Sequence, residues 1–271
     1  MKSGVEQVKK NESHTPGFLP TEPLIMVVGN YGSGKTEVAV NLALCLATSG
    51  RSVSIADLDI VNPYFRCREA RILMESAGIR VVVPPAAQTW ADLPIVVPRI
   101  KGMLQPEDGQ VSLFDVGGDD VGARILSSFR EALGQSPYEL WQVINARRPF
   151  TNTVEGCLAM RAGIEKSSRL RVTGFILNTH LMQETTPEVI LEGIELGREV
   201  SRRSGVAIRL ATAMGEFARD VRIQQTGLPI LALSRHMLPP WLCKEAKTGE
   251  TGETEDDKDL PARKAVPIGR R

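Results

Sequence analysis

Residues 24–36 read LIMVVGNYGSGKT, and this stretch decides the fold. Its first half is a continuous run of apolar, mostly β-branched residues, which is typical of a strand covered on both faces. Its second half, residues 29–36, fits the pattern G-x-x-x-x-G-K-[ST]. The residues that follow, TEVAVNLALCLA (36–47), predict a helix. A strand, a glycine-rich turn and a helix in this order predict a loop that binds phosphate groups, called a P-loop.

The residue types of this loop suit a nucleoside triphosphate. Glycines permit positive φ angles and let the backbone approach a phosphate closely. Successive backbone N–H groups then surround the anion, and the start of the following helix strengthens the site. We expect Lys35 to reach the β- and γ-phosphates and the Thr36 hydroxyl to bind Mg²⁺. The predicted nucleotide-binding residues here are Gly29, Asn30, Tyr31, Gly32, Ser33, Gly34, Lys35 and Thr36.

Apolar runs alternate with amphipathic stretches along the rest of the chain. The predicted strands are 24–29, 52–57, 80–83, 111–115, 139–145, 172–178, 207–211 and 229–231, and the predicted helices are 34–48, 65–76, 121–133, 151–164, 187–204 and 216–222. This alternation predicts an α/β fold, with a three-layer, doubly wound and mostly parallel sheet. Ligands of such sheets bind at the carboxyl ends of the strands.

Acidic residues end two of the predicted strands. Asp57 and Asp59 end the second strand in SIADLDIVNP, and Asp115 ends a later strand in VSLFDVGGDD. The form Asp115-x-x-Gly118 predicts a switch in which the aspartate approaches Mg²⁺ and the glycine N–H touches the terminal phosphate. The alternative is that these aspartates are ordinary turn residues, with Asp57 and Asp59 belonging to the turn before Asn62-Pro63.

Together these motifs resemble the MinD/ParA/CobQ-type P-loop ATPases of the SIMIBI class over about residues 24–242. The motifs are the P-loop, Asn41-Leu42-Ala43, DLD (57–59), D-x-x-G (115–118), GFILN (174–178) and GLPIL (227–231). Asp59 follows Lys35 by 59 − 35 = 24 residues. The resemblance implies that Asp59 orients the attacking water and that Asp57 supports the metal together with Thr36 and Asp115. The phrase DLDIVNPYFR is similar to that of a bacterial branch known only as nucleotide-binding.

Two positions depart from related sequences. Family members that dimerise over ATP often have a lysine that crosses to the partner at the position of Asn30, so a homodimer of that kind is in question. Arg66 or Arg68 could supply a cation instead, or both could be solvated charges. The Asn178-Thr-His-Leu181 stretch lacks the Lys and Asp of the guanine motif N-K-x-D. This favours adenine, contacted by Asn178, over guanine; the alternative makes Asn178 a plain turn residue.

Composition limits the classes of partner. The 271 residues carry a net charge of +1, which gives no bulk attraction to nucleic acid or membrane. The four cysteines form no C-x-x-C pair, and no apolar run approaches the ~18 residues of a membrane helix. We therefore expect a cytoplasmic protein with a protein partner. Arg147 and Arg148, after the strand 139–145, are candidates to face ligand or partner.

The predicted organisation is a loose arm (1–22), the nucleotide-binding domain (23–243) and a disordered charged tail (244–271). The proline-rich stretch Pro84–Pro98 is either a partner or substrate loop or a packed connection. Three functions fit: an ATP- and Mg²⁺-dependent ATPase that switches a protein partner, an ATP-dependent small-molecule kinase or ligase of the CobQ/dethiobiotin-synthetase type, and a non-catalytic nucleotide-binding scaffold or metal-centre assembly factor.

Overall fold

The computed structural model describes residues 20–58, 70–82, 100, 102–117, 120–134 and 136–237, with the backbone alone for residues 120–122. Contacts divide the chain into residues 1–237 and 238–271, and every described residue lies in the first unit. Several expectations therefore lie outside the described residues. These concern the arm up to residue 19, the charged tail, the stretch Pro84–Pro98, and the residues Asp59, Arg66, Arg68 and Gly118.

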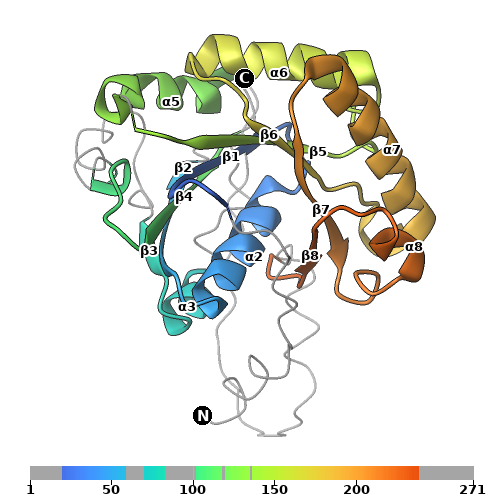
Figure 1. The fold of residues 1–271 in the computed structure, drawn as a ribbon, viewed down its shortest axis with the longest axis horizontal. Coiled ribbons are helices and arrows are strands. Elements are labelled where there is room, and N and C mark those ends of the chain that lie inside the picture. The colour runs from blue at the N-terminus through green and yellow to red at the C-terminus, as the bar shows by residue number, and fades with distance from the viewer. Residues whose placement is uncertain are drawn as a thin grey trace, which may run out of the picture. The chain divides into compact units, whose positions relative to one another are not determined.

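Eight strands form one parallel sheet in the order β3-β2-β4-β1-β5-β6-β7-β8 (Figure 1). The elements are β1 (Leu24–Gly29), α2 (Lys35–Thr48), β2 (Ser52–Leu58), α3 (Arg71–Ser76), β3 (Arg80–Val82), β4 (Gln110–Val116), α5 (Asp120–Leu133), β5 (Glu139–Ile144), α6 (Val154–Ser168), β6 (Gly174–Leu177), η3 (Met182–Glu184), α7 (Pro187–Ser204), β7 (Ile208–Met214), α8 (Val221–Gln224) and β8 (Ile230–Leu233). The predicted α/β fold with a doubly wound parallel sheet is confirmed.

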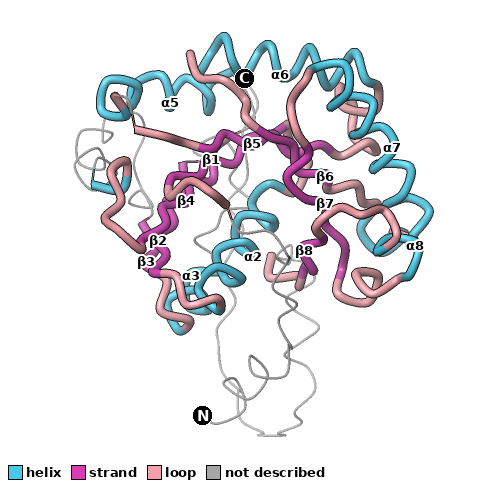
Figure 2. The backbone as a smooth tube through the Cα atoms, viewed as in Figure 1, coloured by secondary structure: helices cyan, strands magenta, loops and turns pink. Residues whose placement is uncertain are grey.

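Helices cover both faces of the sheet, which gives three layers. Helices α5, α6 and α7 lie on one face, and α2 and α3 lie on the other (Figures 1 and 2). Side chains of β1 alternate between the two cores: Leu24 and Met26 pack on the first face, and Ile25 and Val27 pack on the second. Strand β1 lies between β4 and β5 and is buried along its whole length. The loop that follows its carboxyl end is therefore near the middle of the sheet.

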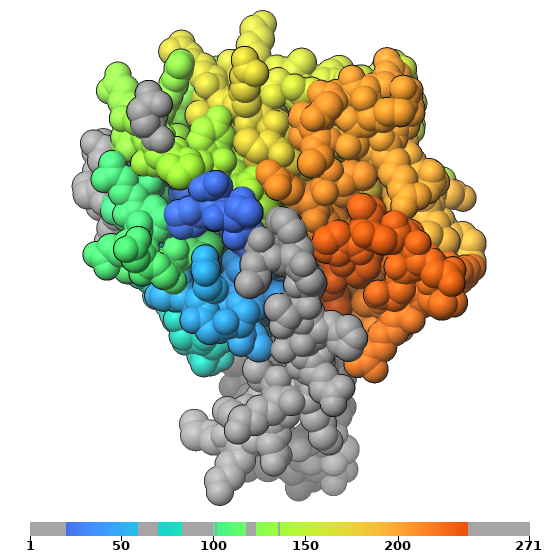
Figure 3. Space-filling view, viewed as in Figure 1, coloured from blue at the N-terminus to red at the C-terminus, as the bar shows by residue number. Residues whose placement is uncertain are grey.

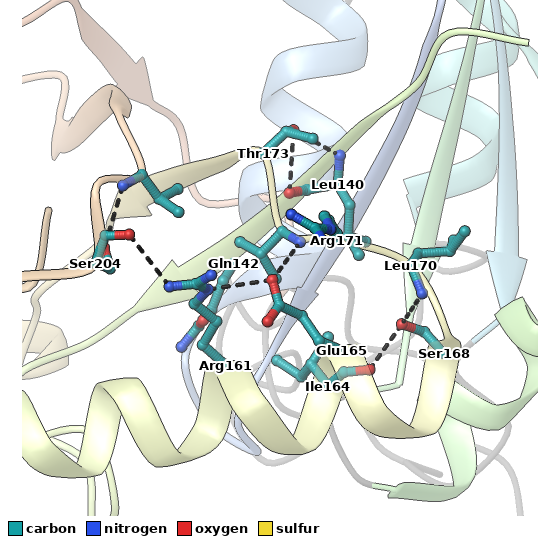
Figure 4. Close-up of polar contacts among 12 residues, drawn as sticks. Leu140, Gln142, Arg161, Ile164, Glu165, Ser168, Leu170, Arg171, Thr173 and Ser204 are labelled. Atoms are coloured by element: carbon teal, nitrogen blue, oxygen red, sulfur yellow. Dashed lines mark hydrogen bonds and ion pairs between the residues drawn. The ribbon is translucent and has the colours of Figure 1, made fainter.

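Polar contacts fix the chain where α6 leads into β6 (Figure 4). The Glu165 carboxylate accepts hydrogen bonds from Arg161 Nε at 3.2 Å and from the Val172 backbone N–H at 3.0 Å. The Ser168 hydroxyl accepts from the Leu170 N–H at 3.2 Å. These two bonds thus satisfy the backbone N–H groups of Leu170 and Val172 in the connection between α6 and β6.

Helix starts differ from the prediction where a capping side chain decides them. The predicted start of the helix over 216–222 is wrong. Helix α8 begins at Val221, because the Asp220 side chain caps it by accepting a hydrogen bond from Arg222 N. The helix predicted from residue 151 begins at Val154, because Thr153 caps it through Gly156 N. Side-chain caps stabilise the first turn of a helix and so set where it begins.

The residues at the start of the described chain, drawn in the darkest blue, reach the surface on the side of the molecule seen in Figure 3. Among the described residues, no helix has both the length and the apolar character needed to span a bilayer.

Candidate functional site

The loop between β1 and α2 has the backbone of a phosphate cradle. Gly32 and Gly34 have φ angles of 72° and 83°, which favour glycine. A Cβ at Gly34 would also lie under 3.0 Å from the Asn178 amide nitrogen. A Cβ at Gly29 would lie 2.8 Å from the Val143 carbonyl oxygen. The glycines of the motif are therefore required both by conformation and by the close approach of β5 and β6.

Charge and hydrogen-bond donors concentrate where α2 begins. Lys35 and Thr36 are only 4% and 5% exposed. No described side chain caps α2, and the N–H groups of a first helical turn attract an anion. The buried Ser33 hydroxyl has no hydrogen-bond partner among the described residues. A buried lysine beside an uncapped helix start fits a polyphosphate.

Two aspartates lie side by side near this loop. In the register of the sheet, Asp115 pairs with Val27 of β1 and also with Asp57 of β2. Val27 packs on the face covered by α2. Because register partners in a parallel sheet point to the same face, both carboxylates lie on the α2 side, where Thr36 also lies. Both aspartates are buried.

The Thr36 hydroxyl and the Asp57 and Asp115 carboxylates offer oxygen atoms, the ligands that Mg²⁺ prefers. Within the described ranges, no group of three or more His, Cys, Asp or Glu side chains could hold a metal ion. Thr36, Asp57 and Asp115 stay predicted metal ligands.

Asn178, at the end of β6, supports the phosphate loop directly. Its Nδ2 donates to the Ser33 carbonyl at 2.7 Å, and its Oδ1 accepts from the Thr212 hydroxyl at 2.6 Å. One N–H and one lone pair of the amide remain for a nucleobase. The contact to adenine stays a prediction, whereas the link to the loop is a role that the sequence did not indicate.

The two arginines after β5 have different surroundings. Arg147 is exposed and forms an ion pair with Glu192 of α7. Arg148 is half-buried, and its Nε donates to the Gly32 carbonyl at 2.9 Å. Only the second therefore belongs to the site. The Arg-Arg dipeptide drew attention in the sequence, but nothing local distinguishes its two members.

His180 lies beside the loop as a neutral imidazole. Burial above all, with the positive charges of Arg148 and Arg235, lowers the pKa of His180 from 6.5 to about 4. A Cβ at Gly34 would lie 3.2 Å from its Nε2. At neutral pH, this side chain adds hydrogen-bonding capacity near the loop without adding charge.

The first turns of α2 hold the segment that follows β8. Asn41 Nδ2 donates to the Ser234 carbonyl at 3.0 Å, and Asn41 Oδ1 accepts from Ser234 N at 2.8 Å. Glu37 accepts from the backbone N–H groups of His236 at 2.7 Å and Met237 at 3.1 Å. Burial raises the pKa of Glu37 above its usual value of 4.5. The Asn41 motif thus has a structural role at this edge.

The structure places the P-loop, Asp57, Asp115 and Asn178 at the carboxyl ends of β1, β2, β4 and β6, and their roles in binding stay predictions. Asp59 and Gly118 lie outside the described residues.

No protein-family model and no curated protein matches the chain. Solved structures resemble it. The cell division protein FtsY of Thermotoga maritima is 23% identical, with a TM-score of 0.50, over 76% of this chain and 67% of that protein. The Signal Recognition Particle 54 kDa protein of Aeropyrum pernix K1, in complex with GDP, is 19% identical, with a TM-score of 0.46, over 76% of this chain and 45% of that one. FlhF complexed with GTP/Mg²⁺ is 15% identical, with a TM-score of 0.43, over 71% of this chain and 66% of that one.

The similarity to FtsY agrees with the parallel sheet and the loop geometry, and it shows the fold of a P-loop nucleoside triphosphatase. The predicted fold is confirmed, and the SIMIBI class stays a prediction. The narrower MinD/ParA/CobQ type stays a prediction.

Proposed function

We propose that this protein binds ATP with Mg²⁺, hydrolyses it, and uses the bound state to switch a protein partner. The observation that carries the proposal is the position of the Asp57 and Asp115 carboxylates. They lie on the sheet face that also holds the buried Lys35 and Thr36. A phosphate cradle, a lysine and a set of oxygen ligands on one face are the parts that phosphoryl transfer uses.

Each residue then has a role. Lys35 and the N–H groups of the loop bind the β- and γ-phosphates, and Thr36, Asp57 and Asp115 hold the metal. Mg²⁺, when bound, neutralises charge that develops on the phosphate oxygens. Asp59 orients the attacking water, and the Gly118 N–H contacts the terminal phosphate, as the resemblance implies.

A switch follows from where the chain continues after the two aspartates. Strand β2 ends at Leu58 and β4 ends at Val116, one residue beyond Asp57 and Asp115 respectively. Segments that leave the metal site so directly are suited to be ordered by a bound triphosphate and released on hydrolysis. We propose that a protein partner distinguishes these two states.

The proposed base is adenine. Guanine recognition in N-K-x-D proteins uses a carboxylate three residues after the asparagine, and here that position is Leu181. The amide of Asn178 has one donor and one lone pair remaining for the adenine edge. GTP is the competing ligand in the test, and tighter binding of GTP than of ATP would overturn this assignment.

Calorimetric titration with ATP and Mg²⁺, combined with a hydrolysis assay, tests the proposal. We expect Lys35→Ala to abolish binding and Asp115→Asn to lose the Mg²⁺ dependence. Lys166→Ala removes a lysine from the exposed side of α6 and serves as the matched control. If the wild type and Lys35→Ala give the same heats with every magnesium nucleotide, the proposed function is wrong.

Hydrogen exchange tests the switch separately. A non-hydrolysable ATP analogue should increase amide protection in the segments that follow β2 and β4 more than ADP does. Equal protection with both ligands would contradict the switch while leaving nucleotide binding intact.

A further inference from the structure

The carbonyls of the phosphate loop are held from outside by two neighbouring strands. A loop whose N–H groups surround an anion turns its carbonyl groups away from that anion. The Gly32 carbonyl accepts from Arg148 Nε at 2.9 Å, and the next carbonyl, that of Ser33, accepts from Asn178 Nδ2 at 2.7 Å. Arg148 follows β5 and Asn178 follows β6. These donors thus hold two successive peptide groups in the orientation that phosphate binding needs.

The contact with the β5 loop runs in both directions. Arg148 donates to the Gly32 carbonyl, and Asn30 Nδ2 donates to the Pro149 carbonyl at 2.8 Å. Asn30 Oδ1 also accepts from the Tyr31 N–H at 2.8 Å. We call these four residues, Asn30, Gly32, Arg148 and Pro149, the clasp. Asn30 stands at the position of the lysine that crosses to a partner in dimerising relatives, but here its side chain binds within its own chain.

The β5 side of the clasp is a rigid turn. Arg148 N donates to the Asn145 carbonyl at 3.1 Å, and the Thr151 hydroxyl donates to the same carbonyl at 2.8 Å. Phe150 has a φ of 67°, and a Cβ at Gly156 of α6 would lie under 3.0 Å from the Phe150 carbonyl oxygen. A non-glycine residue keeps a positive φ only where its surroundings enforce it. The turn therefore holds the backbone of Arg148 in one position beside the phosphate loop.

We propose that Arg148 is a positioning residue that orders the phosphate loop before nucleotide binds, acting with Asn30 through the clasp. The proposal rests on the proposed function, because it concerns the same site. A preformed loop lowers the ordering cost of binding, so the clasp raises affinity without touching the ligand. Because the loop surrounds phosphates common to ADP and ATP, loss of the clasp weakens both ligands equally.

The chain offers a matched control in the neighbouring arginine. Arg147 has the same side chain one residue earlier, but it is exposed and forms an ion pair with Glu192. Substituting it removes an equal charge from the same turn without removing a donor to the loop. Any effect that depends only on net charge near the site appears in both variants.

The experiment compares Arg148→Gln, Arg148→Lys, Asn30→Ala and Arg147→Gln in the full chain. The first measurement is the ¹⁵N order parameter of the Gly32 and Gly34 amides in the nucleotide-free protein. We expect values near those of rigid backbone, about 0.85, for the wild type and Arg147→Gln, and a fall toward about 0.6 for Arg148→Gln and Asn30→Ala. Arg148→Lys keeps a charged donor and should restore part of the order.

The second measurement is calorimetric affinity for ADP and ATP. Arg148→Gln should weaken both by about tenfold, which corresponds to about 1.4 kcal/mol, while Arg147→Gln leaves both unchanged. Equal order parameters in the Arg148→Gln and Arg147→Gln variants would overturn the proposal. A loss of affinity for ATP but not for ADP would also overturn it, because that result would place Arg148 on the γ-phosphate. A wild type that binds no nucleotide but shows the expected order parameters would refute the proposed function and leave the clasp standing.

Discussion

Gly193 of α7 lets this helix approach the end of β6, and its replacement is the sharpest stability test that the structure offers. A Cβ at Gly193 would overlap the Thr179 side chain, with the Thr179 Cγ2 at 2.9 Å and two atoms closer still. Thr179 is buried and its hydroxyl accepts from Ala146 N at 3.1 Å, so it cannot move aside without breaking that bond. Gly163 of α6 is a matched control, because a Cβ there has no neighbour within 4 Å.

The magnitude follows from two opposing terms. Gly→Ala inside a helix is favourable by about 1 kcal/mol, and this term is common to both sites. Overpacking a buried site costs about 1–3 kcal/mol, and this term applies only at Gly193. We therefore expect Gly163→Ala to raise the free energy of unfolding by about 1 kcal/mol and Gly193→Ala to fall about 1–3 kcal/mol below it.

Urea unfolding followed by far-UV circular dichroism measures this difference, with thermal unfolding as a second readout. Each kcal/mol should move the melting temperature by roughly 2–4 °C in a domain of this size. If Gly193→Ala raises the free energy of unfolding as much as Gly163→Ala does, α7 does not approach Thr179 as closely as described. The placement of β6 and Asn178 against the phosphate loop would then need revision as well.

Two further predictions concern titratable groups at opposite ends of the strands. The Glu139 carboxylate accepts hydrogen bonds from Trp141 Nε1 at 2.9 Å and from Arg209 Nη2 at 2.8 Å. Glu139→Gln should therefore lower the free energy of unfolding by about 3 kcal/mol. The control is Glu199→Gln, which breaks an exposed ion pair with Arg202 and should leave the urea midpoint unchanged. Because the pKa of His180 is lowered from 6.5 to about 4, the unfolded chain binds a proton in that window and the folded chain does not. Stability should therefore fall as pH drops from 6.5 toward 4, more in the wild type than in His180→Gln, and equal losses in both would contradict the buried neutral imidazole.

The phosphate loop shows how much of the site the sequence could predict. The motif of residues 29–36 is contiguous, so its glycines, Lys35 and Thr36 are recognisable without any knowledge of distant contacts. Asp57 and Asp115 were predictable because each ends an apolar strand, and parallel strands bring their carboxyl ends to one edge. Their direct pairing, however, depends on the register between β2 and β4, which residue types alone do not specify.

The roles of Arg148 and Asn178 could not be predicted in the same way. Arg148 meets Gly32 across 116 residues of sequence, and Asn178 meets Ser33 across 145. The sequence showed two adjacent arginines with no local difference between them, and their separation comes from the turn after β5, where one side chain faces the loop and the other faces Glu192.

The sequence by itself determined the strand, turn and helix around the phosphate loop, the alternation that makes the sheet parallel, and the residue types able to hold phosphate and metal. Only the tertiary structure decided which distant side chains contact that loop, where α8 begins, and how closely α7 approaches Thr179 at Gly193. The physical reason is the range of the interactions. Hydrophobic periodicity and φ preferences act within a few residues, whereas hydrogen bonds between loops depend on how strands far apart in the chain come to lie side by side.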